Sequence, residues 1–128
     1  MLLLVDSSEM TVQLAMIDGV ARYDYEWEAG RQFAHDFLGY LRDRLDEHGW
    51  TLSDILGIGV FRGPGSYTGL RIGMSVLNTL ADSLSIPIVG ATGEGWAGDC
   101  ERRLQAGEND QIVLPEYGGD AHVTKPRK

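Results

Sequence analysis

The spacing of the hydrophobic residues changes along this chain, and that change separates the strands it can form from the helices. Over residues 10–17 apolar and polar side chains alternate, and the alternation returns over residues 22–27. A period of two is typical of a strand with one buried face, and the Asp18-Gly19 pair between the two runs favours a hairpin turn. Together with the short apolar run from Leu2 to Val5, these residues predict three antiparallel strands.

After residue 30 the period becomes four. The large apolar residues at this spacing are Phe33, Phe37, Leu41 and Leu45. They predict a helix over residues 32–48, which the following glycine would end. Later apolar runs predict two more strands and two more helices, over residues 55–61, 70–84, 87–89 and 94–105. The order β-β-β-α-β-α-β-α predicts an α/β fold with a mixed five-stranded sheet, in which the later strands pair in parallel.

The composition limits the possible partners. A length of 128 residues is typical of one domain, and 11 basic against 19 acidic residues give a formal net charge of −8. A protein that binds a nucleic-acid backbone normally carries a basic stripe, and this chain has none. The apolar opening reaches Asp6 too soon for a signal peptide or a membrane span. We therefore expect a cytoplasmic protein that binds proteins or small molecules, without membrane or direct nucleic-acid contact.

The most unusual segment is glycine-rich and covers residues 62–73, where a predicted strand leads into a predicted helix. Free N–H groups at a helix start can hold a phosphate. No lysine follows as in a Walker loop, however, and the three residues between Gly65 and Gly69 exclude the dinucleotide fingerprint. Gly69 and Gly73 lie one helical turn apart, so the interpretation that we favour is a tight turn followed by close packing or partner docking.

Asp6, Ser7 and Ser8 follow the first predicted strand and allow two interpretations. Asp-Ser-Ser readily forms a turn, which is the interpretation that we favour. A carboxylate at the end of a first strand is also where actin-like ATPases hold metal-bound phosphate.

Residues of the usual catalytic sets are scattered. His35, His48 and His122 lack metal-ligand spacing, and Cys100, as a single cysteine, excludes an internal disulfide. Ser66 does not have the spacing of a nucleophile elbow. We predict no catalytic residue and no metal site.

One long run of residues matches a known family. Residues 63–73, Gly-Pro-Gly-Ser-Tyr-Thr-Gly-Leu-Arg-Ile-Gly, resemble the G-P-G-S-F/Y-T-G-L/V-R-I-G signature of the TsaB (YeaZ) family. Residues 4–8 resemble the I-D-T-S/A opening of that family, and Pro115-Glu116-Tyr117 resembles the P-x-Y near its C-terminus. Residues 52–55 and 86–90 fall where the family has similar segments. The chain is therefore identified as a member over residues 1 to about 100.

The resemblance implies a single actin-like (ASKHA, ribonuclease-H-like) lobe with a non-catalytic role. TsaB supports TsaD, which holds the metal and transfers the threonylcarbamoyl group to adenosine 37 of tRNAs that decode ANN codons, while TsaE is an ATPase. The implied partners are TsaD, TsaE through the TsaB–TsaD complex, and a second copy in a homodimer, with tRNA contacted only indirectly. The chain would need no cofactor of its own, because ATP and the metal belong to the partner subunits.

The resemblance also places docking on the helices predicted over residues 32–48 and 70–84. The partner-binding residues carried over by position are Phe33, Phe37, Leu38, Leu41, Leu45, Gly69, Leu70, Arg71, Gly73, Met74 and Leu77. The family signature loop comprises Gly63, Pro64, Gly65, Ser66, Tyr67 and Thr68.

The chain departs from the family pattern after its third predicted helix. Family members carry a second, similar domain there, whereas Pro115 follows Gln105 within ten residues. We expect an actin-like lobe over residues 1–106, with a linker and C-terminal tail over residues 107–128 in place of the second domain. Because an actin-like nucleotide cleft needs two lobes, this favours a non-catalytic role.

Two other functions stay open at this stage. One is a small actin-like nucleotide-dependent phosphotransferase or ATPase, with Asp6 as metal or water ligand and residues 63–66 around the phosphate. The other is a dimer module without any connection to tRNA.

Overall fold

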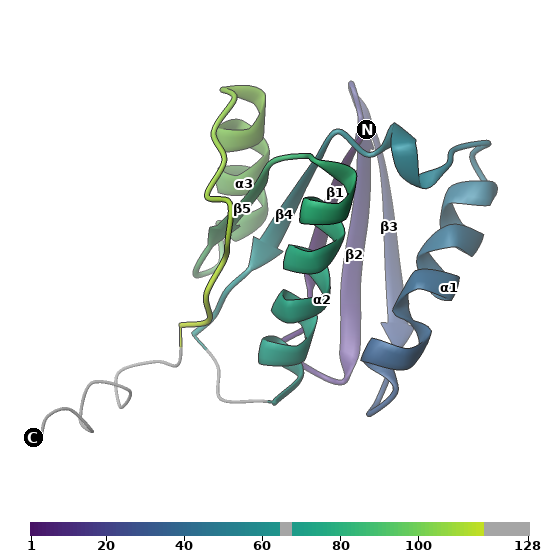
Figure 1. Cartoon of the computed structure of the whole chain (residues 1–128), viewed down its shortest axis with the longest axis vertical. Helices are drawn as coiled ribbons and strands as arrows, with labels where there is room; N and C mark the ends of the chain where they lie inside the picture. The colour runs from purple at the N-terminus through teal and green to yellow at the C-terminus, as the bar shows by residue number, and fades with distance from the viewer. Residues whose placement is uncertain (65–67, 117–128) are drawn as a thin grey trace, which may run out of the picture.

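A five-stranded sheet forms the centre of the structure, a computed structural model that describes residues 1–64 and 68–116 (Figure 1). The strand order is β3-β2-β1-β4-β5. The strands are β1 (Leu2–Asp6), β2 (Thr11–Asp18), β3 (Ala21–Glu28), β4 (Gly57–Phe61) and β5 (Ile88–Ala91). The helices are α1 (Phe33–Asp46), α2 (Thr68–Leu84) and α3 (Trp96–Gln105), with a short 3₁₀ helix at Leu52–Asp54.

The strand pairing follows the hydrophobic pattern. β1 pairs antiparallel with β2, which in turn pairs antiparallel with β3 through a turn at Gly19, where φ is +63°. A positive φ of this size favours glycine, as the hairpin signal predicted. β1 also pairs in parallel with β4, and β4 in parallel with β5. The predicted mixed sheet and the predicted order of elements are confirmed.

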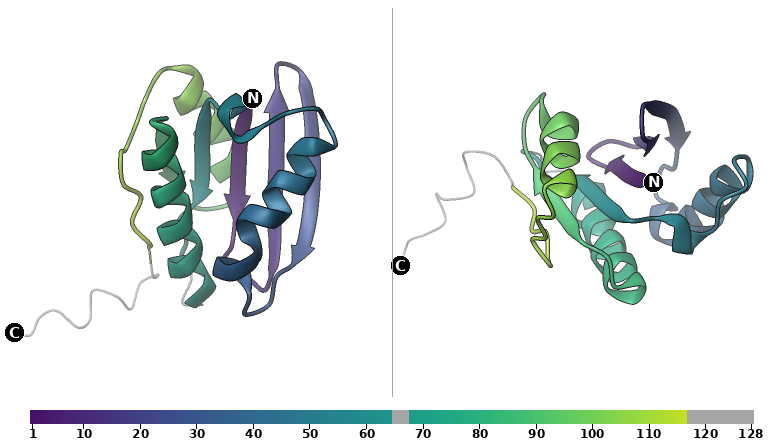
Figure 2. Two further views of the ribbon diagram at one scale, coloured as in Figure 1. Left: turned by 45° about the vertical axis from the view of Figure 1, so that its right-hand side comes forward. Right: turned by 90° about the horizontal axis from the view of Figure 1, so that it is seen from above.

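Helices cover the sheet on both faces (Figure 2). α1 and α2 pack on one face over the larger core, where Phe37 and Leu77 are completely buried. α3 packs on the other face over a smaller core around Leu4 and Cys100. Among the described residues, no helix combines the length and the apolar character that a membrane crossing requires.

Aromatic side chains fix α1 to the edge strand β3. Trp27 stacks on Tyr40 of α1, with ring centroids 4.6 Å apart. The Tyr25 hydroxyl lies 2.7 Å from His48 Nε2 and 3.2 Å from a carboxylate oxygen of Glu47. Burial, helped by the hydrogen bond to Glu47, raises the pKa of the Tyr25 hydroxyl. These contacts hold the middle and the C-terminal end of α1 against the sheet.

The third helix begins later than the sequence predicts. β5 extends to Ala91, and Gly93, with a φ of +78°, then turns the chain. The helix therefore starts at Trp96, two residues after the predicted start at residue 94.

Residues 107–116, which we call the strap, pack along the free edge of β5. The side-chain oxygen of Asn109 accepts the Ile88 N–H at 3.0 Å, and a carboxylate oxygen of Asp110 accepts the Gly90 N–H at 3.0 Å. Two side chains thus satisfy backbone groups that a further strand would otherwise pair with. Val113 is 3% exposed and belongs to the larger core.

Three other residues of the lobe hold the strap in place. Asn78 of α2 exchanges two hydrogen bonds with the backbone of Val113, both 2.9 Å long. Arg103 of α3 pairs with two carboxylates of the strap, and Arg62 Nε donates to the Leu114 carbonyl at 2.9 Å. The sequence left open whether this segment packs, and up to residue 116 it does.

Candidate protein-docking site

A crevice between α1 and α2 is the surface that the two helices form together. Both helices start at the same end of the sheet and run in the same direction (Figure 1). Three hollows follow one another between them, and the lining positions repeat every fourth residue: Ala34, Leu38, Arg42 and Asp46 on α1, and Ile72, Val76, Leu80 and Leu84 on α2. Residues at this spacing share one face of a helix. We call this surface the α1–α2 crevice.

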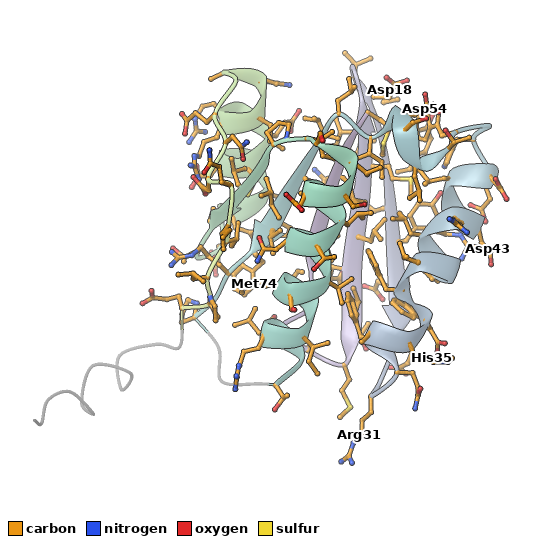
Figure 3. All side chains as sticks on the ribbon, in the orientation of Figure 1. Asp18, Arg31, His35, Asp43, Asp54 and Met74 are labelled. Atoms are coloured by element: carbon orange, nitrogen blue, oxygen red, sulfur yellow. The ribbon has the colours of Figure 1, made fainter. Side chains whose placement is uncertain are left out.

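The lower hollow lies at the starts of both helices and has a volume of about 380 Å³. Met10 and Ile72 contribute apolar side chains to it that are 45% and 38% exposed. Arg31, which precedes α1, also lines this hollow and extends from the lower end of the molecule (Figure 3).

The middle and upper hollows continue the crevice toward the ends of the helices. In the middle hollow, of about 260 Å³, Leu38 is 44% exposed and shares the lining with Val76. In the upper hollow, of about 450 Å³, Trp50 lies among other apolar residues, and Arg42 and Asp46 are the charged lining residues. An apolar groove open to solvent can accept apolar side chains of a partner, and in particular one face of a helix.

Eight of the predicted partner-binding residues lie in the core: Phe33, Phe37, Leu41, Leu45, Leu70, Gly73, Met74 and Leu77. Phe33 and Leu45 still line the floors of the lower and upper hollows. The other six lie beneath the surface, where a partner cannot reach them while the lobe is folded, so their assigned role changes from contact to support of the surface above. The physical reason is that the most regular apolar stripe of each helix faces the sheet.

Three predicted docking residues remain accessible. Leu38 and Arg71 are exposed and Gly69 is half-buried, and docking through them stays a prediction. The sequence reasoning did not select Ile72 or Val76, although apolar residues just beside the buried stripe were the available signal.

The two helical glycines of the signature pack against the loop after β1 and not against another helix. A Cβ placed on Gly73 would lie 1.9 Å from the Ser7 hydroxyl oxygen. Ser7 is 2% exposed, and its hydroxyl donates to the Gly69 carbonyl at 3.1 Å. The pair Ser7–Gly73 therefore fixes the first turns of α2 on the end of β1, and this corrects the predicted helix–helix contact.

The signature loop leaves β4 beside the end of the strap. Gly63 is buried with a φ of +118°, and a Cβ there would lie 2.1 Å from the Glu116 carbonyl oxygen. The Glu116 N–H donates to the Arg62 carbonyl at 2.6 Å. Pro64 is exposed and Thr68 begins α2. The rest of the predicted loop lies outside the described residues: Gly65, Ser66 and Tyr67.

Asp6 forms a turn, because its carboxylate accepts the Ser8 N–H at 2.9 Å. Over residues 1–64 and 68–116, no three His, Cys, Asp or Glu side chains come together in a way that could hold a metal ion. Cys100 belongs to the buried face of α3, where burial raises the pKa of its thiol to about 11. The thiol is therefore neutral near pH 7 and a poor nucleophile.

Comparison with known proteins identifies the family. A family model described as TsaD, tRNA N6-adenosine threonylcarbamoyltransferase, matches residues 27–92, just over half of the chain. The chain belongs to this family. It is a TsaB/YeaZ-like protein, and its fold is the actin-like lobe that the resemblance implied.

Three relatives illustrate the match. The TsaB protein of Escherichia coli (strain K12), named for tRNA threonylcarbamoyladenosine biosynthesis, is 30% identical over 92 residues, which are 71% of this chain and 39% of that protein. The tRNA N6-adenosine threonylcarbamoyltransferase of Trichlorobacter lovleyi is 40% identical over 101 residues, which cover 74% of this chain and 28% of that protein. The solved structure of YeaZ from Pseudomonas aeruginosa matches with a TM-score of 0.66 at 30% sequence identity. The match covers 82% of this chain and 49% of that protein. The chain spans less than half the length of each.

Proposed function

We propose that this TsaB/YeaZ-like lobe is a non-catalytic subunit in the formation of N6-threonylcarbamoyladenosine at position 37 of tRNAs that decode ANN codons. It docks on TsaD in the cytoplasm and supports the transfer that TsaD performs. TsaE joins through the TsaB–TsaD complex, and tRNA contacts the chain only indirectly. The observation that carries the proposal is the open α1–α2 crevice on a member of this family.

The crevice supports the docking part of the proposal through its exposed apolar residues. Met10, Leu38 and Ile72 are between 38% and 45% exposed on one continuous surface. Removing apolar surface from water favours association, and the part that exceeds the cost of ordering the two partners appears as affinity. Beneath the crevice, the buried stripes of both helices and the Ser7–Gly73 contact hold the surface in a fixed shape.

Contacts at the root of the signature loop support the non-catalytic part. A phosphate cradle needs N–H groups that point toward the anion. The Glu116 carbonyl oxygen occupies the position that a Cβ on Gly63 would take. Its partial negative charge would repel a phosphate. The Asp6 carboxylate is engaged in its own turn. We therefore assign metal and nucleotide chemistry to the partner subunits.

The test is binding of the full chain to the TsaD enzyme of the same organism, measured by isothermal titration calorimetry. Leu38→Asp puts a charge into the middle hollow, and we expect it to weaken binding by at least tenfold, or about 1.4 kcal/mol. Leu56→Asp is the matched control, because Leu56 is 65% exposed and lies outside the crevice. The docking proposal fails if the wild-type chain does not bind, or if both variants bind as the wild type does.

A further inference from the structure

The arginines of the described residues fall into two groups. Five of the eight pair with carboxylates: Arg22, Arg44, Arg62, Arg102 and Arg103. The other three, Arg31, Arg42 and Arg71, are exposed and make no ion pair or side-chain hydrogen bond within the part of the chain that the structure describes. In a chain with a net charge of −8, these three arginines are the ones left to face a partner, because the other five are engaged with carboxylates of the chain itself.

Two of the three unpaired arginines line the α1–α2 crevice, and the third lies beside it on α2. Arg31 lines the lower hollow and Arg42 the upper one. Arg71 is one and two turns before Ser75 and Thr79, which line the middle hollow, so it continues their stripe on α2. Unpaired positive charge is therefore present at both ends of the crevice and beside its α2 wall.

Negative charge is sparse on the same surface. Asp46, in the upper hollow, is the only carboxylate among the described residues that line the three hollows. Asp43 also belongs to α1, but it lies on the side of the helix turned away from α2 (Figure 3). On α2, the exposed Asp82 follows Thr79 by three residues and so lies on the same side of the helix as Arg71. The crevice and its α2 border thus carry three arginines and two carboxylates over an apolar floor, on an otherwise acidic protein.

We propose that the α1–α2 crevice selects an acidic partner surface, an apolar ridge flanked by Asp or Glu side chains, in preference to a second copy of this chain. The inference rests on the proposed docking function and adds the chemistry of the partner. Opposite charges across an interface accelerate association and exclude partners of the wrong sign. A second copy would bring its own unpaired arginines to the contact, so self-association through the crevice is the weaker mode.

The test compares two double variants that change the net charge by the same amount. Arg31→Glu with Arg71→Glu reverses charge along the crevice, whereas Arg22→Glu with Arg102→Glu reverses paired arginines on β3 and α3. Binding to the TsaD enzyme of the same organism is measured by biolayer interferometry at about 50 mM and about 500 mM salt. We expect the crevice variant to bind about tenfold more weakly at low salt, mainly through slower association. The control should stay within about twofold of the wild type.

Self-association is followed in parallel by sedimentation velocity. Salt screens attraction and repulsion alike, so raising it should weaken the complex with TsaD and leave self-association unchanged or stronger. Equal loss of binding in both double variants, or no loss in either, would overturn the selection of an acidic partner while leaving docking intact. A homodimer tighter than the TsaD complex at low salt would also overturn it. Absence of wild-type binding at both salt concentrations would contradict the docking function itself.

Discussion

Gly73 marks the closest approach between α2 and the end of β1. A methyl group added there would lie 1.9 Å from the hydroxyl oxygen of the buried Ser7 and 2.6 Å from its Cβ. Either α2 or the chain around Ser7 would therefore have to shift. We predict that Gly73→Ala lowers the free energy of unfolding by roughly 1–3 kcal/mol, measured by urea denaturation. The reason is overpacking inside the lobe, which is independent of any partner.

Gly39 of α1 and Gly98 of α3 provide the control for this prediction. A Cβ at either position meets nothing within 4 Å, so alanine there removes the flexibility of a helical glycine without a clash. We expect Gly39→Ala to raise stability by about 0.5–1 kcal/mol. If Gly73→Ala were as stable as Gly39→Ala, the close contact with Ser7 would be refuted.

Cys100 gives a second prediction at the residue scale. Burial raises the pKa of its thiol to about 11, so the reactive thiolate is scarce at neutral pH. In the folded protein we expect slow reaction with a disulfide reagent at pH 8 and fast reaction in concentrated urea. Immediate labelling of the native protein at pH 8 would show that α3 does not hold this side chain against the sheet.

At the scale of elements, the strap depends on Asn78. Its side chain exchanges two hydrogen bonds with the backbone of Val113, and Asn78→Ala would leave both backbone groups without these partners. We predict a loss of roughly 1–3 kcal/mol of stability and faster hydrogen exchange over residues 107–116. The exposed Ser83 of the same helix is the control, since Ser83→Ala should leave both measurements unchanged. Equal exchange in the two variants would mean that the strap is held by other contacts.

The strap also carries a pH dependence through Asp110. Burial alone would raise the pKa of its carboxyl, but hydrogen bonds from Arg103 and the Gly90 N–H outweigh it, and the pKa is lowered from 3.8. A carboxyl whose pKa is lower in the folded chain than in the unfolded chain stabilises the fold above its unfolded pKa. This stabilisation is lost as the pH falls through the folded pKa. We therefore expect Asp110→Asn to cost about 0.5–1 kcal/mol at pH 7 in urea denaturation. The difference from the wild type should shrink as the pH falls below 3.8 and through the lowered pKa of the folded carboxyl. A difference that stays constant under acid titration would contradict this assignment.

The elements differ in how well the sequence predicts them, for a physical reason. Side chains meet the core at a regular interval in β2, β3, α1 and α2. The inward position of Tyr25 or Phe37 could therefore be predicted from spacing alone. The strap has no period: its position depends on single bonds between Asn78 and Val113, or Asp110 and Gly90, which join distant parts of the chain. Such pairs leave no local pattern.

At the scale of the whole molecule, the apolar stripes from which the sequence predicts docking are not the faces that the two helices expose, and docking through these helices stays a prediction. Phe37, Leu41 and Leu77 form the most regular stripes, and burial against the sheet produces that regularity. The accessible crevice is formed by the positions beside them, such as Leu38 and Val76, whose exposure depends on how closely two separate helices approach. Spacing within one helix does not contain that information.

The most direct measurement of the central claim is the rate of threonylcarbamoyladenosine formation in tRNA by the TsaD enzyme of the same organism, with TsaE and the threonylcarbamoyl donor supplied. We expect no product from the chain alone, faster product formation when the chain joins TsaD, and loss of that stimulation with Leu38→Asp but not with Leu56→Asp. A rate that is the same with and without the chain would contradict the claim.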